Sequence, residues 1–265
     1  PYYKTNTSPA VFRQHVKFLA ENGYRTLSLQ ALASELRAPH SAPRHPVRSV
    51  AITFDDGFRN FYTEAFPALQ EHGFTATMFL PTAFIGESRR PFAPRASTSA
   101  FGRECLTWDE VREMRKSGMH FGSHTVSHPK LVELAWPEIR SEISDSKAEI
   151  EQRLGEAVRT FAYPFAYPQM NRQFVARFTD ELRSAGYLCC ATTQVGRLNI
   201  GDDPYRMNRL PVNSLDDLSL FRAKLEGAYD WLAAPQTLVK RIKARGRMLR
   251  QPSLEASTEV SARLN

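Results

Sequence analysis

Short apolar segments of β-branched and aromatic residues alternate with amphipathic helical patterns through most of this chain. Of all the features of the sequence, this alternation restricts the possible folds most. The clearest helical pattern begins at Pro137, places Ile139, Ile143 and Ile150 on one face, and ends at Gly155. Similar patterns predict helices over residues 9–23, 67–73, 107–116 and 173–185, and strands over residues 25–29, 49–54, 75–80, 119–123, 160–163 and 187–193. The alternation predicts an α/β fold with a mainly parallel sheet, whose carboxyl edge collects the functional residues.

The size and composition of the chain fit one large domain. Its 265 residues can bury a substantial core. The hydrophobic share of 42% and the charged share of 24% lie near the averages for soluble domains. No apolar run approaches the roughly 20 residues that span a bilayer. Residues 39–48 and 89–103 are polar and contain prolines, which predicts exposed loops.

The formal net charge of +7 is concentrated in part near the C-terminus. A stretch without acidic residues contains Lys240, Arg241, Lys243, Arg245, Arg247 and Arg250. We expect this basic segment, residues 235–265, to be a solvated tail or helix face, with peripheral contact to a membrane or an anionic polymer as the alternative. No nucleic acid partner is expected, because no aromatic residues are interleaved with the charges.

The three cysteines, Cys105, Cys189 and Cys190, are an odd number, and the last two are neighbours in a predicted strand. They are expected to be free thiols, because adjacent strand residues are poorly placed for a disulfide. Free thiols favour a reducing compartment, but disulfide-free periplasmic proteins are common, so bacterial cytoplasm and cell envelope both remain open. The chain begins at Pro1, which suggests a trimmed N-terminus that is uninformative about export.

Two adjacent carboxylates, Asp55 and Asp56, end the predicted strand 49–54 and are followed by Gly57. At a strand end that turns through a glycine, both side chains can reach one pocket. Like charges this close are unfavourable unless a cation or hydrogen-bond donors compensate them. Taken alone, the same residues could equally form a helix cap or a turn.

Two histidines, His124 and His128, follow the predicted strand 119–123. At this spacing they can share one metal ion, on a helical face or across a tight turn. Alone they would more often be ordinary structural or surface histidines. Together with the two adjacent carboxylates, however, they offer one oxygen and two nitrogen ligands at strand ends of the same sheet, and three protein ligands leave open positions for water and substrate. A structural or surface role is expected for the remaining histidines, His15, His40, His45, His72 and His120.

The ordered motifs TFDDG (residues 53–57), HTVSH (124–128) and FAYPF (161–165) resemble the polysaccharide deacetylase family, carbohydrate esterase family four, also called the NodB homology domain. The likeness extends from residue 18 to residue 212. It implies a distorted (β/α) barrel with about seven strands and a metal site at their carboxyl ends. Residues 1–48 would then be an N-terminal helix, strand and loop leading into the barrel, and residues 49–234 the catalytic domain.

The resemblance also implies roles for individual residues. Asp56, His124 and His128 would hold one divalent metal ion, zinc first, with cobalt or nickel as alternatives. Asp55 would be the general base, a role that typically contributes about 100- to 10,000-fold in rate. The backbone N–H of Phe165, at the place of the family's tyrosine, would complete an oxyanion hole, and such a donor contributes roughly 3 kcal/mol.

The chain departs from the family pattern in three places. Ala162 replaces an arginine that holds the catalytic carboxylate in many relatives, so we expect Arg209 to take its place, with Arg206 as the second candidate; either could equally be a surface arginine. Ala166 stands where a glycine usually follows the aromatic residue. No histidine follows His128. The resemblance implies that a later histidine would protonate the leaving amine. Here that proton must come from Asp55 or another residue, or activity is reduced.

The predicted function is metal-dependent hydrolysis of the N-acetyl group, in preference to an O-acetyl group, of N-acetylhexosamine units in a poly- or oligosaccharide. Two alternatives stay open: a deacylase of a non-polymeric amide or a lipid- or nucleotide-linked sugar, and a catalytically weak carbohydrate-binding relative. Trp108, Tyr167 and Trp231 could be sugar platforms, but core packing is the favoured interpretation for each.

Overall fold

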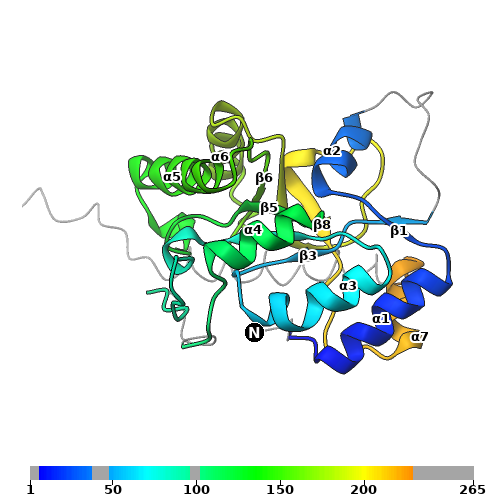
Figure 1. Ribbon diagram of the computed structural model, residues 1–265. Helices are drawn as coiled ribbons and strands as arrows, with labels where there is room; N and C mark the ends of the chain where they lie inside the picture. The colour runs from blue at the N-terminus through cyan, green and yellow to red at the C-terminus, as the bar shows by residue number, and fades with distance from the viewer. Residues whose placement is uncertain (1–5, 38–47, 96–101, 229–265) are drawn as a thin grey trace, which may run out of the picture.

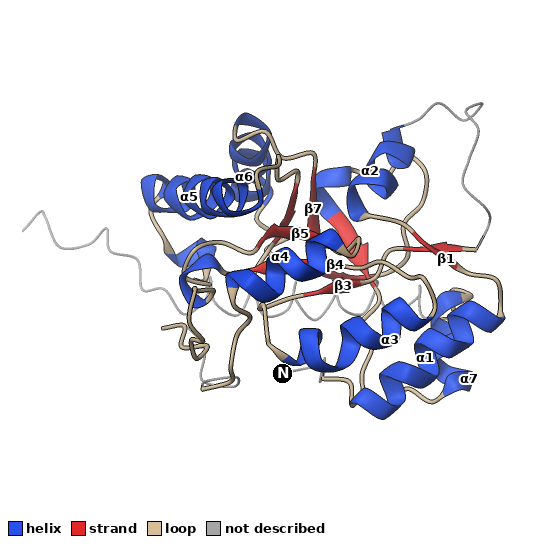
Figure 2. Cartoon of the chain, viewed as in Figure 1, coloured by secondary structure: helices blue, strands red, loops and turns tan. Residues whose placement is uncertain are grey.

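The structure is a computed structural model that describes residues 6–37, 48–95 and 102–228 (Figure 1). Its centre is a six-stranded parallel sheet in which each strand pairs with the next along the chain. The strands are β3 (Thr53–Phe54), β4 (Thr77–Leu80), β5 (His120–Ser123), β6 (Thr160–Ala162), β7 (Cys189–Val195) and β8 (Met207–Arg209). The sheet is curled into a half-barrel with helices around it (Figure 2), which confirms the predicted α/β barrel class.

A further pair of strands lies beside the main sheet. β1 (Arg25–Thr26) pairs in parallel with β2 (Ser49–Val50). The predicted strand 49–54 is therefore divided: its first part pairs with β1, and its last part is β3, which pairs with β4. The carbonyl oxygen of Ile52, between the two parts, accepts a hydrogen bond from the backbone N–H of Thr77 at 2.9 Å. The chain changes its partner strand at this point.

The helices form where the sequence supplies caps and an apolar face. The α-helices are α1 (Pro9–Glu21), α2 (Leu29–Arg37), α3 (Phe66–Glu71), α4 (Trp108–Lys116), α5 (Trp136–Leu154), α6 (Arg172–Ser184) and α7 (Leu218–Leu225). A π-helix, η1 (Phe61–Ala65), precedes α3, and the short 3-10 helices are η2 (Thr82–Phe84), η3 (Leu131–Glu133) and η4 (Pro204–Arg206). Thr107 and Glu110 form a capping box on α4, and Gly155 ends α5 in the left-handed conformation. No helix in the described ranges has both the length and the apolarity to cross a bilayer.

Two α-helices and one strand of the described chain lie where the sequence patterns predicted none. α2 begins at Leu29, at the end of a predicted strand, and β8 and α7 follow the last predicted strand. α7 packs against α1, and the two ends of the described chain are joined there. The Lys224 ammonium donates to Asp216 at 2.6 Å, and both side chains are buried. His15 of α1 is buried as well, with its Nε2 2.7 Å from the Asp216 carbonyl oxygen.

The core lies between the sheet and its surrounding helices. Phe161 of β6 contacts Phe178 of α6 and Tyr187, with ring centroids 5.8 and 5.4 Å apart. Trp108 and Tyr167 are only 1% exposed, which confirms the core interpretation for both. The three cysteines are buried free thiols, as predicted. Trp231, His40, His45 and the basic segment 235–265 lie outside the described residues.

Gly122 on β5 is required by close packing between strands. A Cβ atom there would overlap Thr160 Oγ1 and lie 2.6 Å from a ring carbon of Phe79. Since both neighbours are buried, neither can move freely. We expect Gly122→Ala to lower the free energy of unfolding by about 1–3 kcal/mol, measured by chemical denaturation. Ser184→Ala, at an exposed helix end, is the control and should change it by less than about 0.5 kcal/mol; an equally small effect of Gly122→Ala would contradict the packing argument.

Candidate active site

The first motif turns sharply after β3. Asp56 has φ +72° and Gly57 has φ +63°, so two consecutive residues adopt the left-handed conformation. For a non-glycine residue this conformation is unfavourable by about 1 kcal/mol. A Cβ on Gly57 would also lie 2.8 Å from Ile85 Cδ1. The turn directs the carboxylates of Asp55 and Asp56 to different partners.

The two histidines lie on a tight turn after β5, not on a helix. Thr125 and His128 have φ values of +70° and +54°. The Thr125 hydroxyl accepts from the His128 backbone N–H at 3.0 Å and donates to the His124 carbonyl oxygen. Glu142 of α5 accepts from the two backbone N–H groups between them, at 2.7 and 2.9 Å. The turn is therefore held from inside by a hydroxyl and from outside by a carboxylate.

The two motifs meet at Asp56. Its Oδ1 lies 3.5 Å from His124 Nε2 and 3.2 Å from His128 Nε2. The three potential ligand atoms lie within 4.8 Å of one another, and in the described part of the chain no other group of three His, Cys, Asp or Glu residues is arranged to hold a metal ion. The structure thus brings together the three residues that the sequence singled out as ligands.

The two histidine rings are oriented in different ways. His124 Nδ1 lies 2.8 Å from the Ala162 carbonyl oxygen. A carbonyl only accepts, so Nδ1 carries a proton, and Nε2 is the nitrogen that a metal ion would bind. His128 Nδ1 is buried and has no hydrogen-bond partner among the described residues. Its ring is instead packed between Phe92 and Phe165, at centroid distances of 5.4 and 4.6 Å.

The charges at this site act strongly on one another. Burial alone would raise the pKa of Asp56, but hydrogen bonds from His124 and His128 hold that pKa far below its ordinary value. Burial opposes a charge on His124, yet the hydrogen bond with Asp56 and the charge of Asp55 raise its pKa. For His128, burial dominates and lowers the pKa. Asp56 is consequently an ionised carboxylate beside a neutral His128, which suits a metal ligand set.

Arg209 of β8 holds the second carboxylate. Its two terminal nitrogens each donate to one oxygen of Asp55 at 2.8 Å, and its Nε donates to the Thr192 carbonyl oxygen at 2.9 Å. Burial alone would raise the pKa of Asp55, but the guanidinium of Arg209 and the nearby His124 hold it below its ordinary value. Of the two candidate arginines, the structure therefore brings Arg209 to Asp55. Arg206 lines a separate hollow.

Phe165 lies beside the same site in a strained backbone conformation, with φ +60°. The Thr193 hydroxyl donates to its carbonyl oxygen at 3.0 Å and accepts from the Tyr167 backbone N–H at 2.9 Å. Among the described residues, the backbone N–H of Phe165 has no acceptor. This N–H is thus a free donor next to the ligand cluster.

Phe92 is a site residue that the sequence reasoning missed. It falls in the segment 89–103, which was expected to be an exposed loop, but it is 2% exposed and packs against Phe58, Phe84 and His128. For Phe92 the expectation was wrong, because burial against three aromatic rings outweighs the polar character of its sequence neighbours. The only available signal was the presence of an aromatic residue in a polar segment.

Comparison with known families identifies the chain. The family model described as polysaccharide deacetylase matches residues 42–188. The chain belongs to the polysaccharide deacetylase family. Members of this family are carbohydrate-active hydrolases that cleave amide bonds and depend on a metal ion. The resemblance inferred from the three motifs is thereby confirmed.

Several relatives of this polysaccharide deacetylase are known. YxkH of Bacillus subtilis (strain 168) is 29% identical over 219 residues, which are 81% of this chain and 68% of that protein. The poly-β-1,6-N-acetyl-D-glucosamine N-deacetylase of Escherichia coli (strain K12) is 30% identical over 124 residues, 44% of this chain. The enzyme of the same name from Staphylococcus aureus (strain MSSA476) is 24% identical over 169 residues, 60% of this chain. The chain spans only 17% and 53% of the length of these two enzymes.

Solved structures share the fold. A Streptococcus pyogenes deacetylase, PplD in complex with acetate, superposes with a TM-score of 0.67 at 23% identity and covers 83% of this chain and 87% of that one. IcaB from Ammonifex degensii superposes with a TM-score of 0.64 at 22% identity, and the match covers 85% of this chain and 91% of that one. These likenesses confirm the half-barrel architecture.

The contacts of Glu142 predict that it stabilises the histidine turn. Glu142→Ala removes the acceptor of two backbone N–H groups and of the Ser127 hydroxyl. Since hydrogen bonds to a charged group are the stronger kind, we expect a loss of about 1–3 kcal/mol in unfolding free energy and faster amide hydrogen exchange at Val126 and Ser127. Asp145→Ala, on an exposed part of α5, is the matched control; equal exchange in the two variants would refute the role of Glu142.

Proposed function

We propose that this polysaccharide deacetylase hydrolyses the N-acetyl groups of N-acetylhexosamine units in a poly- or oligosaccharide, using one zinc ion, and releases acetate and a free amine. The observation that carries the proposal is the convergence of Asp56, His124 and His128 next to a carboxylate that Arg209 holds. Zinc is proposed first, and cobalt or nickel would suit the same side chains.

The donor set fits such an ion on its own chemistry. One carboxylate oxygen and two imidazole nitrogens form a typical catalytic zinc set, in which open positions remain. The hydrogen bond from His124 Nδ1 to the Ala162 carbonyl fixes the tautomer that leaves Nε2 available. When bound, the ion would supply a positive charge that polarises the acetyl carbonyl and activates water.

Asp55 is the proposed general base and general acid. It accepts a proton from the attacking water while a bond forms between the water oxygen and the acetyl carbon. It then returns that proton to the amide nitrogen as the C–N bond breaks, so that acetate and an amine leave. One residue is assigned both steps because no histidine follows His128 in the sequence.

Arg209 is the proposed positioning residue for Asp55. Its two parallel hydrogen bonds fix the plane of the carboxylate, and its charge keeps Asp55 ionised at neutral pH. The backbone N–H of Phe165 is proposed to stabilise the negative charge that develops on the acetyl oxygen, because it is a donor without an acceptor beside the site.

The names of two relatives guide the choice of substrate. The Escherichia coli and Staphylococcus aureus proteins are named as N-deacetylases of poly-β-1,6-N-acetyl-D-glucosamine. We propose a polysaccharide that contains N-acetylglucosamine as the substrate class of this chain, ahead of a non-polymeric amide or a lipid- or nucleotide-linked sugar. The paired Asp55 and the complete ligand set favour turnover over carbohydrate binding alone.

The ligand assignment predicts the metal content. Zinc titrated into metal-free protein should bind at about one ion per chain, measured by calorimetry and elemental analysis. His124→Ala removes one of three ligands, so we expect zinc affinity to fall by more than about 100-fold. His72→Ala, in the C-cap of α3, is the histidine control and should bind as the wild type does. Unchanged affinity in His124→Ala would refute the site.

The proton-transfer assignment predicts kinetic losses without loss of metal. Acetate release should be measured from poly-β-1,6-N-acetylglucosamine, chitin oligomers and peptidoglycan fragments. Asp55→Asn removes the proton acceptor, so kcat should fall about 100- to 10,000-fold while the zinc content stays constant. Arg209→Lys keeps the charge but not the two parallel bonds, and about a 10- to 100-fold fall in kcat is expected.

Arg25→Lys, at an exposed position on β1, is the matched control for Arg209→Lys and should retain wild-type kcat. Wild-type turnover in the Asp55→Asn variant would exclude Asp55 as the general base. No acetate from any of the three substrates by a zinc-loaded wild type would count against deacetylation of these polymers.

A further inference from the structure

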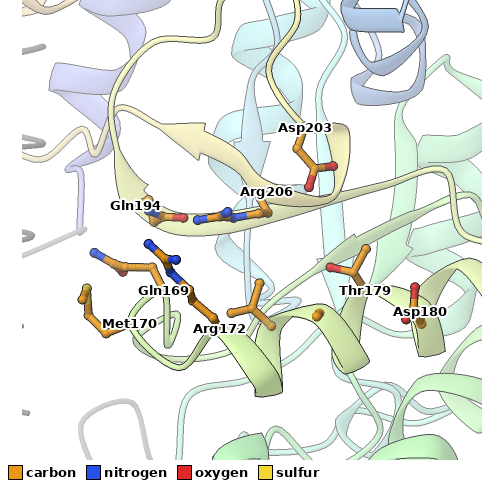
Figure 3. A pocket seen from close by; sticks show the side chains of 10 residues that line it. Gln169, Met170, Arg172, Thr179, Asp180, Gln194, Asp203 and Arg206 are labelled. Atoms are coloured by element: carbon orange, nitrogen blue, oxygen red, sulfur yellow. The ribbon is translucent and has the colours of Figure 1, made fainter.

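A hollow of about 610 Å³ lies outside the metal-ligand cluster, between α6 and the segment that precedes β8. Figure 3 shows its lining side chains. Two guanidinium groups, from Arg172 and Arg206, are directed toward one end of it, where the amides of Gln169 and Gln194 also lie. Two carboxylates, Asp180 and Asp203, lie toward the other end. The hollow is therefore polarised.

The carboxylates of the hollow have partners, whereas its two guanidinium groups have no carboxylate partner among the residues that the structure describes. Asp180 accepts from Arg183 at 2.8 Å, and Asp203 accepts from the Tyr205 backbone N–H at 2.9 Å. Within the described ranges, neither Arg172 nor Arg206 forms an ion pair. Arg206 interacts with the Tyr167 hydroxyl. A guanidinium carries several N–H donors, however, so Arg172 and Arg206 together still offer planar cationic donors, which match an oxyanion and not a cation.

The donor end lies at the same edge of the sheet as the active site. Arg172 begins α6, which follows the carboxyl end of β6. Gln194 lies near the carboxyl end of β7, directly after Thr193, whose hydroxyl holds the Phe165 carbonyl. The hollow and the ligand cluster thus share the carboxyl edge of the sheet, where one glycan chain could contact both.

The other lining residues suit a sugar. Met170 and Val175 supply apolar surface at the donor end, against which the C–H face of a pyranose ring can pack. The exposed fraction of Met170 is 40%, unusually high for a methionine.

We propose that this hollow binds a sugar unit with a carboxylate, such as a uronic acid, in the glycan whose N-acetylhexosamine unit lies at the ligand cluster. Arg172 and Arg206 bind the carboxylate, and Gln169 and Gln194 bind hydroxyl groups of the same sugar. This inference rests on the proposed function and narrows its substrate class to acidic heteropolysaccharides.

Two oligosaccharides of equal length test the proposal by calorimetry on the zinc-loaded protein at low salt. Hyaluronan oligomers alternate N-acetylglucosamine with glucuronate, and chitin oligomers contain N-acetylglucosamine alone. We expect the wild type to bind the hyaluronan oligomer at least about tenfold more tightly. The double variant Arg172→Gln/Arg206→Gln should lose this preference, and Arg172→Lys/Arg206→Lys should keep part of it.

The matched control is Arg13→Gln/Arg25→Gln, which removes two exposed charges from α1 and β1 and should keep the full preference. A wild type without preference, or an equal loss in the control, would overturn the proposal. Displacement of the hyaluronan oligomer by equimolar inorganic phosphate would do so too, because it would reveal a general oxyanion site.

Acetate release separates this proposal from the proposed function. If chitin oligomers release acetate but no preference exists, the hollow is wrongly assigned and deacetylation stands. If no oligomer releases acetate but the arginine-dependent preference persists, the binding site stands and the proposed reaction fails.

Discussion

The ion pair between Arg209 and Asp55 connects the two edges of an open sheet. Asp55 follows β3 and Arg209 ends β8, and these are the first and last strands in the sheet order. The guanidinium also lies 3.4 Å from Thr53 Oγ1 and donates to the Thr192 backbone. A half-barrel that lacks strands between its edges needs such a connection, and here the connecting group is also the one that orients the proposed base. The side chains of Arg209 and Asp55 are 20% and 31% exposed, so solvent screens the pair only partly.

Backbone strain is concentrated where the chemistry is proposed. The described non-glycine residues with positive φ are Asp56, Thr125, His128 and Phe165. Each one is a potential ligand, a residue of the histidine turn, or the free backbone donor. Such conformations persist only where surrounding contacts impose them, and here the Thr125 hydroxyl, Glu142 and the Thr193 hydroxyl do so. The strain is distributed over three loops that share one rigid sheet edge.

The sequence predicted the fold class well because the longer helices show their period and the segments between them are rich in β-branched and aromatic residues. It failed at short elements: β8, with three residues, was missed, and the division of the predicted strand 49–54 into β2 and β3, with two residues each, was not visible. α7 was missed because its burial depends on α1, at the other end of the described chain. The contact of Arg209 with Asp55 was predicted correctly from the place of Arg209 in an Arg-Leu-Pro stretch. No local pattern, however, could show that β8 lies opposite β3.

The site residues that the sequence could not reveal act through packing. His124 is oriented by a hydrogen bond to the Ala162 carbonyl, which is directional. His128 has no such bond at Nδ1, so its ring orientation depends on contact with Phe92 and Phe165. Dispersion contacts are non-directional and restrict a ring only when they come from several sides. Phe92 therefore helps to orient His128, as the Ala162 carbonyl orients His124. At position 165 the aromatic ring supports His128 while the backbone N–H remains free, and neither task requires the hydroxyl of a tyrosine.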